Sequence, residues 1–233
     1  MSSNRFAKGK LYRFLDYVLR LVLLNFLMII PSFSFLIIYS LFSKDTTSIW
    51  FYLTLIPLVI YLFPSIVATT DVIRQYEDDQ TNTIFKDFFK SLKKHYIKAF
   101  IIGIIVIVFV FLLSNSLTYF INNHSRDYVH LIGLFVTISF ILIAIFLLAH
   151  LPLVMVYFSD LSIFEYFKLA LIMSFKDFGT TFIMTLIIVI VLVVSLLYYF
   201  VMFIAGISIM IYFIVKLTFK QYIKIYRKVE KND

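Results

Sequence analysis

The sequence predicts an all-α membrane protein, a polytopic helix bundle with about six transmembrane helices and two cytoplasmic amphipathic surface helices. Its composition is 62% hydrophobic and 15% charged with a mean hydropathy of +0.99, whereas soluble domains are about half apolar and a quarter charged. The apolar residues form uninterrupted stretches such as 101–113 and 183–200, and a helix that is apolar on every side needs lipid or other helices around it. The segments between these stretches leave no room for a soluble domain, so residues 1–233 are expected to form a single membrane domain.

The first predicted span covers residues 21–42 and follows an amphipathic lead-in. Asp16 and Arg20 in the lead-in are four residues apart and can pair on one helix face. Pro31 lies within the span and removes one backbone hydrogen bond, so we expect a bend there. The second predicted span covers residues 49–73 and opens with aromatic residues typical of a membrane interface.

Two segments, 83–98 and 160–178, are predicted to be amphipathic helices on the membrane surface. The first has aromatic residues on one side and lysines on the other, a pattern typical of a helix lying flat on an anionic bilayer. The second repeats this pattern more weakly. The residues expected to contact the membrane surface or a protein partner are Phe85, Phe88, Phe89, Lys90, Lys93 and Lys94.

Four further spans complete the predicted bundle. The third and fourth cover residues 99–120 and 131–158. The last apolar stretch would measure about 60 Å as one helix, roughly twice the thickness of the hydrocarbon. It is therefore expected to fold back at 198–206, which gives spans at 180–199 and 205–222, as a full or a re-entrant hairpin.

The distribution of charge favours this arrangement with both termini in the cytoplasm of a cell-membrane protein. Of the 21 lysines and arginines, only Lys44 and Arg126 then fall outside, as the positive-inside rule requires. Five spans would instead place the basic C-terminal tail outside. The net charge of +8 fits an interaction with anionic lipids, and no nucleic acid partner is expected.

Several short motifs carry a resemblance to a known family. They are Asn25 followed by Pro31, the segment 64–68, the segment 84–90 reading Ile-Phe-Lys-Asp-Phe-Phe-Lys before Lys93-Lys94, and the segment 170–178 reading Ala-Leu-Ile-Met-Ser-Phe-Lys-Asp-Phe. With the order of the spans, they make the chain resemble the YesL-like family of bacterial membrane proteins of unknown function. Two places depart from the family pattern: Phe-Pro-Ser at 63–65 replaces a Gly-Pro pair, and Thr-Thr-Asp at 69–71 is more polar. The resemblance implies an accessory or regulatory role beside carbohydrate uptake systems and assigns no catalytic residue.

The sequence offers little for catalysis. Cysteine is absent, which excludes disulfides, thiolate nucleophiles and cysteine-bound metals. The four histidines include no pair at the spacing of a helical zinc site, and no glycine-rich phosphate loop is present. His124, Asp127 and His130 could form an external ligand cluster, although a hydrated loop is the favoured interpretation. We therefore expect no enzyme, catalytic residue, metal or cofactor.

A candidate intramembrane polar site comprises Asn25, Asp71, Arg74 and His150, because polar groups within spans are costly and often functional. Asp71 and Arg74 lie one turn apart and are expected to pair. We expect Asn25 to bond across helices. His150 could donate to the Leu148 carbonyl, which Pro152 leaves without a partner, and its alternatives are ligand binding or a proton relay.

Three functions remain open from the sequence. The first is a non-enzymatic accessory protein whose cytoplasmic surface helices dock a transporter or a sensor. The second is a small transporter or flippase-like carrier, motivated by His150, the prolines and a faint internal repeat of span, surface helix and span. The third is a lipid-modifying enzyme, which would need a polar cluster that the sequence does not display.

Overall fold

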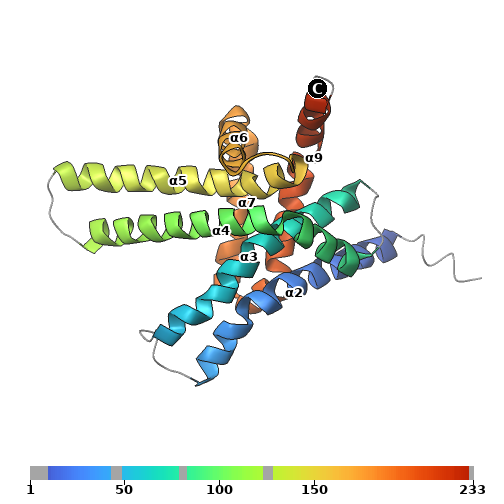
Figure 1. Ribbon diagram of the computed structural model, residues 1–233, viewed down its shortest axis with the longest axis horizontal. Helices are drawn as coiled ribbons and strands as arrows, with labels where there is room; N and C mark the ends of the chain where they lie inside the picture. The colour runs from blue at the N-terminus through green and yellow to red at the C-terminus, as the bar shows by residue number, and fades with distance from the viewer. Residues whose placement is uncertain (1–9, 43–48, 79–82, 123–127, 231–233) are drawn as a thin grey trace, which may run out of the picture.

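The computed structural model describes residues 10–42, 49–78, 83–122 and 128–230, and within these ranges the chain is helical with short connections and no strand (Figure 1). This confirms the all-α prediction. The elements in order are α2 (Lys10–Phe42), α3 (Ile49–Glu77), α4 (Ile84–Asn122), α5 (Tyr128–Tyr157), α6 (Ile163–Lys176), α7 (Phe178–Leu197), α8 (Tyr199–Val201), the π-helix η1 (Met202–Gly206) and α9 (Ile207–Glu230).

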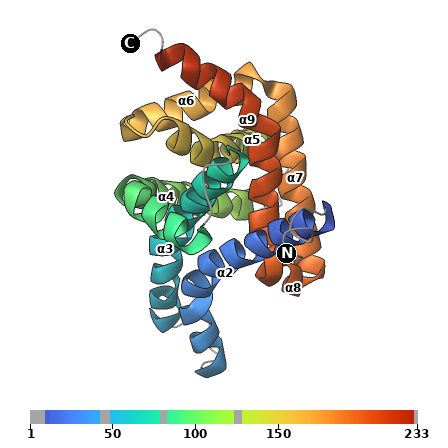
Figure 2. The same ribbon diagram turned by 90° about the vertical axis from the view of Figure 1, so that its right-hand side faces the viewer.

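The long helices of the described chain pair as three antiparallel hairpins, α2 with α3, α4 with α5, and α7 with α9 (Figures 1 and 2). We call the ends where α2, α4 and α7 begin and α3, α5 and α9 finish the open end. The opposite, connected ends of the α2–α3 and α4–α5 hairpins point in different directions, so the hairpins spread apart from the open end (Figure 1).

Side-chain hydrogen bonds hold the helix ends together at the open end. The Tyr17 hydroxyl of α2 donates to the Glu77 carboxylate at the end of α3 over 3.0 Å. The Gln221 amide of α9 donates to the Asp177 carboxylate, which caps the start of α7, over 2.6 Å. Each bond joins the first part of one helix to the last part of its hairpin partner, so the α2–α3 and α7–α9 hairpins are each held together at the open end.

Five helices of the described chain are long and apolar enough to cross a membrane, with candidate segments Phe14–Pro31, Ile84–Asn122, Tyr128–Tyr157, Phe178–Ser195 and Ile204–Tyr226. They correspond to the first and to the third to sixth predicted spans. The predicted span 49–73 is helical in α3, but the side chains of residues 32–59 lie outside the described residues. The predicted turn at 198–206 contains α8 and η1, and α9 then returns alongside α7 as a full hairpin.

The predicted surface helix at 83–98 and the predicted span at 99–120 lie in one continuous helix, α4, of 39 residues. Its length of about 58 Å is nearly twice the hydrocarbon thickness of about 30 Å. Residues 84–98 therefore extend beyond the apolar part of α4.

The second segment predicted to lie on the membrane surface, 160–178, contains a separate helix, α6, and its place at the surface stays a prediction. α6 begins with a capping box, in which the Ser162 backbone N–H donates to the Glu165 carboxylate over 2.7 Å and the Glu165 backbone N–H donates back to the Ser162 hydroxyl. Lys98 of α4 fixes the connection that precedes α6, since its ammonium donates to the Ser159 and Leu161 carbonyls over 2.8 and 3.0 Å. Burial raises the pKa of Tyr166 to about 12, so its hydroxyl remains protonated and donates to the same Ser159 carbonyl.

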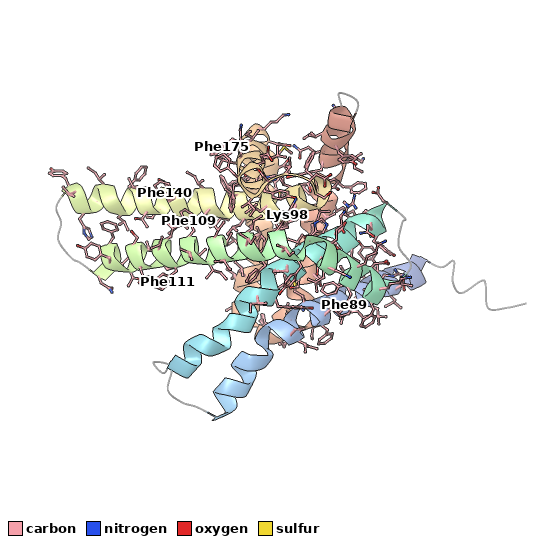
Figure 3. All side chains as sticks on the ribbon, in the orientation of Figure 1. Phe89, Lys98, Phe109, Phe111, Phe140 and Phe175 are labelled. Carbon is pink, nitrogen blue, oxygen red and sulfur yellow. The ribbon has the colours of Figure 1, made fainter. Side chains whose placement is uncertain are left out.

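The core lies at the open end and is centred on the last part of α5. Every residue from 149 to 157 is buried, surrounded by α3, α4, α6, α7 and α9. The half of the α4–α5 hairpin nearer its connected end is exposed instead of buried. Phe109 and Phe111 of α4 and Phe140 of α5 are between 41% and 65% exposed there (Figure 3). This apolar exposed surface is what a lipid-facing hairpin requires.

Candidate functional site

Asp71 is the centre of a buried polar cluster between α3 and α4. Asp71 is 2% exposed. Its carboxylate accepts from the Arg74 guanidinium through Nη2 at 3.0 Å and from the Ser91 hydroxyl at 2.7 Å. The predicted Asp71–Arg74 pair is therefore confirmed, and Ser91 is a partner that the sequence did not identify. His95 lies alongside, but its Nε2 is 3.8 Å from the carboxylate, beyond hydrogen-bond distance.

The face of α4 that meets this cluster includes a residue that the sequence assigned to the surface. Phe88, Ser91, His95 and Ala99 recur at three- and four-residue spacing, and all are buried. Phe88 is fully buried in the core. The prediction that Phe88 contacts the membrane surface or a partner is therefore wrong. Phe88 lies on the buried face of α4 together with Ser91 and His95.

The opposite face of α4 agrees with the predicted exposure. Phe85 and Phe89 are 54% and 52% exposed, and Figure 3 labels Phe89 on this part of the helix. Phe85, Phe89 and Lys93 form one row at four-residue spacing, and Lys86, Lys90 and Lys94 form the neighbouring row. We call these six exposed residues the α4 basic face.

His150 is the centre of a second buried cluster, which joins α5, α7 and α9. Its Nδ1 lies 2.8 Å from the Tyr222 hydroxyl and its Nε2 lies 2.9 Å from the Thr181 hydroxyl. Thr181 donates its proton to a backbone carbonyl of Ser174 or Asp177, so its oxygen accepts from the imidazole. The network therefore assigns the proton to Nε2 and makes Nδ1 the acceptor for Tyr222. The predicted bond from His150 to the Leu148 carbonyl is wrong.

An aromatic contact connects the two clusters. The Tyr157 and Tyr222 rings pack with their centroids 5.0 Å apart, and the Arg74 guanidinium lies 5.5 Å from the Tyr157 ring centroid. A cation within about 6 Å of an aromatic ring is attracted to its face. Arg74 therefore interacts with Asp71 on one side and with the aromatic pair beside His150 on the other.

Asn25 forms a third set of interactions, between α2 and α9. Its side-chain oxygen accepts from the backbone N–H of Ser208 over 3.1 Å, two residues after η1. A π-helix shifts the backbone bonding by one residue, which leaves groups at its ends that need other partners. The predicted interhelical bond of Asn25 is confirmed, and its partner is a backbone group.

The predicted polar site is thus divided among three sets of bonds that connect helices. Among the described residues, no group of three or more histidines, aspartates and glutamates could hold a metal ion. Of the proposed external ligand cluster, residues 123–127 lie outside the described chain, and His130 bonds to the Phe120 carbonyl of α4. The residues that the sequence missed, Ser91, Thr181, Tyr157 and Tyr222, have no local motif and are brought together only by packing.

These features define a helical protein with several helices able to cross a membrane. Residues 45–117, about a third of the chain, match the model of a family described as "Protein of unknown function, DUF624". The match covers α3 and most of α4, and therefore contains the whole Asp71 cluster. It is consistent with an uncharacterised membrane family and does not supply the YesL-like name. No curated protein and no solved structure matches the chain.

Proposed function

We propose that the chain is a non-enzymatic accessory or regulatory protein of the cell membrane that binds a protein partner through the α4 basic face. Both termini and the open end lie in the cytoplasm in this proposal. The observation that carries it is the continuity of α4. Because one helix contains both the apolar span and residues 84–98, the α4 basic face lies at one end of that span, which this proposal places in water.

The α4 basic face has the properties of a protein-binding surface. Two half-exposed phenylalanines lie beside four lysines, and aromatic residues are enriched where proteins bind one another. Its opposite face is held by Phe88 in the core and by the Ser91–Asp71 bond. The surface is therefore presented on a rigid helix, and its charge favours a partner with an acidic surface.

The buried polar groups support this proposal over a carrier. A solute site near the middle of a membrane needs polar groups that face a cavity and remain available to the solute. Asp71 and both nitrogens of His150 already have partners within the protein. These residues form hydrogen bonds between helices of the protein itself.

The resemblance to YesL-like proteins suggests the first partner to test, a component of a carbohydrate uptake system. The protein would be extracted in mild detergent, and co-purifying proteins would be quantified by mass spectrometry. The test variant combines Lys90→Glu, Lys93→Glu and Lys94→Glu.

A matched control makes the same change of charge elsewhere at the open end, with Lys168→Glu, Lys176→Glu and Lys220→Glu, all exposed in the structure. We expect the first variant to lose one specific partner that the control retains. If both variants retain the same proteins, or if the wild-type protein elutes with lipid alone, the proposal is wrong.

A further inference from the structure

From residue 101 onward, α4 has an exposed face that the described chain leaves uncovered. Exposed residues recur along this face at alternating spacings of three and four. They are Ile101, Ile104, Val108, Phe111, Asn115 and Thr118. We call these six residues the α4 seam. Its apolar members are between 38% and 65% exposed, and Figure 3 shows Phe111 on the side of α4 that faces away from α5.

The spacing of the α4 seam is that of a helix that packs lengthwise against another helix. An average spacing of about 3.5 residues keeps one stripe facing a partner while the two helices coil around each other. The seam is about 25 Å long at about 1.5 Å per residue, which is most of the hydrocarbon thickness of about 30 Å. In the heptad pattern Ile101, Val108 and Asn115 occupy successive a positions. Two-stranded coiled coils favour β-branched residues there and use a single asparagine to fix their register.

Asn115 is the member of the α4 seam that lipid cannot satisfy. Its Nδ2 donates to the Phe111 carbonyl of its own helix over 2.8 Å, and within the described chain its side-chain oxygen accepts no hydrogen bond. Because acyl chains offer no donors, an exposed amide within the predicted span 99–120 is stabilised when another helix supplies a partner. An amide both donates and accepts, so an identical amide is a suitable partner.

We propose that two copies of this chain associate through the α4 seam, around a two-fold axis along the membrane normal. Copies of one membrane protein share their orientation, so each residue of the seam lies at the same depth as its counterpart and meets it across the axis. The two α4 helices are therefore parallel, and Asn115 of one copy bonds to Asn115 of the other. The seam contains no residue of the α4 basic face, so this proposal and the proposed partner surface can fail independently.

Disulfide crosslinking in native membranes tests this pairing, because the chain has no cysteine of its own. Val108→Cys lies in the α4 seam, and Val110→Cys is the matched control, about 200° further around the helix. The two valines are similarly exposed, at 53% and 43%. On oxidation with copper phenanthroline, Val108→Cys should form disulfide-linked dimers and Val110→Cys should remain monomeric. Equal crosslinking of the two variants, or none of Val108→Cys, would overturn the proposal.

Energy transfer between fluorescently tagged copies in lipid vesicles tests the role of Asn115. Asn115→Leu should weaken association about three- to twentyfold, the effect of losing an interhelical hydrogen bond in lipid. Asn115→Gln keeps the amide and should retain most of the association. An unchanged affinity in Asn115→Leu would contradict the proposed pairing, as would assemblies of more than two wild-type copies. Circular dichroism verifies folding, and the comparison of Val108→Cys with Val110→Cys remains decisive if a variant at Asn115 unfolds.

Discussion

Replacing Asp71 with alanine should destabilise the protein far more than removing an exposed carboxylate. The Asp71 carboxylate accepts from Ser91 at 2.7 Å and from Arg74 at 3.0 Å, and its side chain is 3% exposed. Its loss leaves the Ser91 hydroxyl without this acceptor in the core and the Arg74 guanidinium without its anion. The contact between α3 and α4 then loses the hydrogen bond between Ser91 and Asp71.

The magnitude follows from the burial of the two partners. Breaking a buried ion pair by removing one partner costs about 3–5 kcal/mol. Arg74 is 23% exposed and its guanidinium retains the Tyr157 ring, so part of this cost is avoided. We therefore expect the free energy of unfolding to fall by about 2–4 kcal/mol, the upper part of the usual range for single substitutions.

The assay is unfolding in mixed micelles by titration with dodecyl sulfate, followed by circular dichroism at the helical minimum. The matched control is Asp16→Asn, which removes a carboxylate that is 33% exposed and paired with Arg20 within one helix. Such a pair contributes about 0.3–0.5 kcal/mol. If Asp71→Ala costs no more than this control, the Asp71 cluster does not hold α3 against α4 and the reasoning fails.

Three further predictions concern the other interactions at the open end. Tyr222→Phe removes the donor to His150 Nδ1 and should lower the free energy of unfolding by about 1 kcal/mol in the same titration; an unchanged value would show that this bond contributes nothing. Lys98→Met removes both ammonium bonds to the α5–α6 connection, so amide hydrogen exchange should accelerate there and in α6, and unchanged rates would contradict the anchoring role. Hydrogen bonds from Ser162 lower the pKa of Glu165 below its ordinary 4.5, so the carboxylate's contribution to the cap is present above 4.5 and is lost as the pH falls through the lowered pKa. Protection of the amides in the first turn of α6, measured relative to their intrinsic exchange rates, should therefore fall in acid for the wild-type protein, whereas this fall should be absent in Glu165→Gln.

The sequence predicted the helices well because long apolar stretches leave few alternatives. The fold-back at 198–206 was predictable from length alone, and the structure places α8 and η1 there. The continuity of α4 was missed because its pattern changes at Ala99 from two-sided to wholly apolar. That change marks the point where the surroundings change, and no proline in residues 84–122 interrupts the helix.

The error at Phe88 has a different cause. Assigning a face by hydrophobicity grouped Phe88 with Phe85 and Phe89, although the buried face of α4 also contains Ser91 and His95. Ser91 can be buried because α3 supplies the Asp71 carboxylate, which accepts from its hydroxyl. A sequence shows which residues share a face but not which polar partners a neighbouring helix provides.

His150 illustrates the same limit over a longer distance. Its burial followed from its place in an apolar stretch, but its partners Thr181 and Tyr222 are 31 and 72 residues away. Local reasoning therefore chose the Leu148 carbonyl within the same helix. The opposite success, the interhelical bond of Asn25, was predictable because an amide in an apolar helix has few other partners.

The central claim is that the hairpins cross the membrane with the open end on one side and the connected ends on the other. The chain contains no cysteine, so single-cysteine variants can be labelled without background. Intact cells producing Lys94→Cys, Lys168→Cys or Tyr128→Cys would be treated with a membrane-impermeant maleimide; Tyr128, at the start of α5, is 85% exposed. Labelling of Tyr128→Cys in intact cells, and of the two lysine positions only after permeabilisation, is the predicted result. Labelling of Lys94→Cys from the same side as Tyr128→Cys would contradict the arrangement.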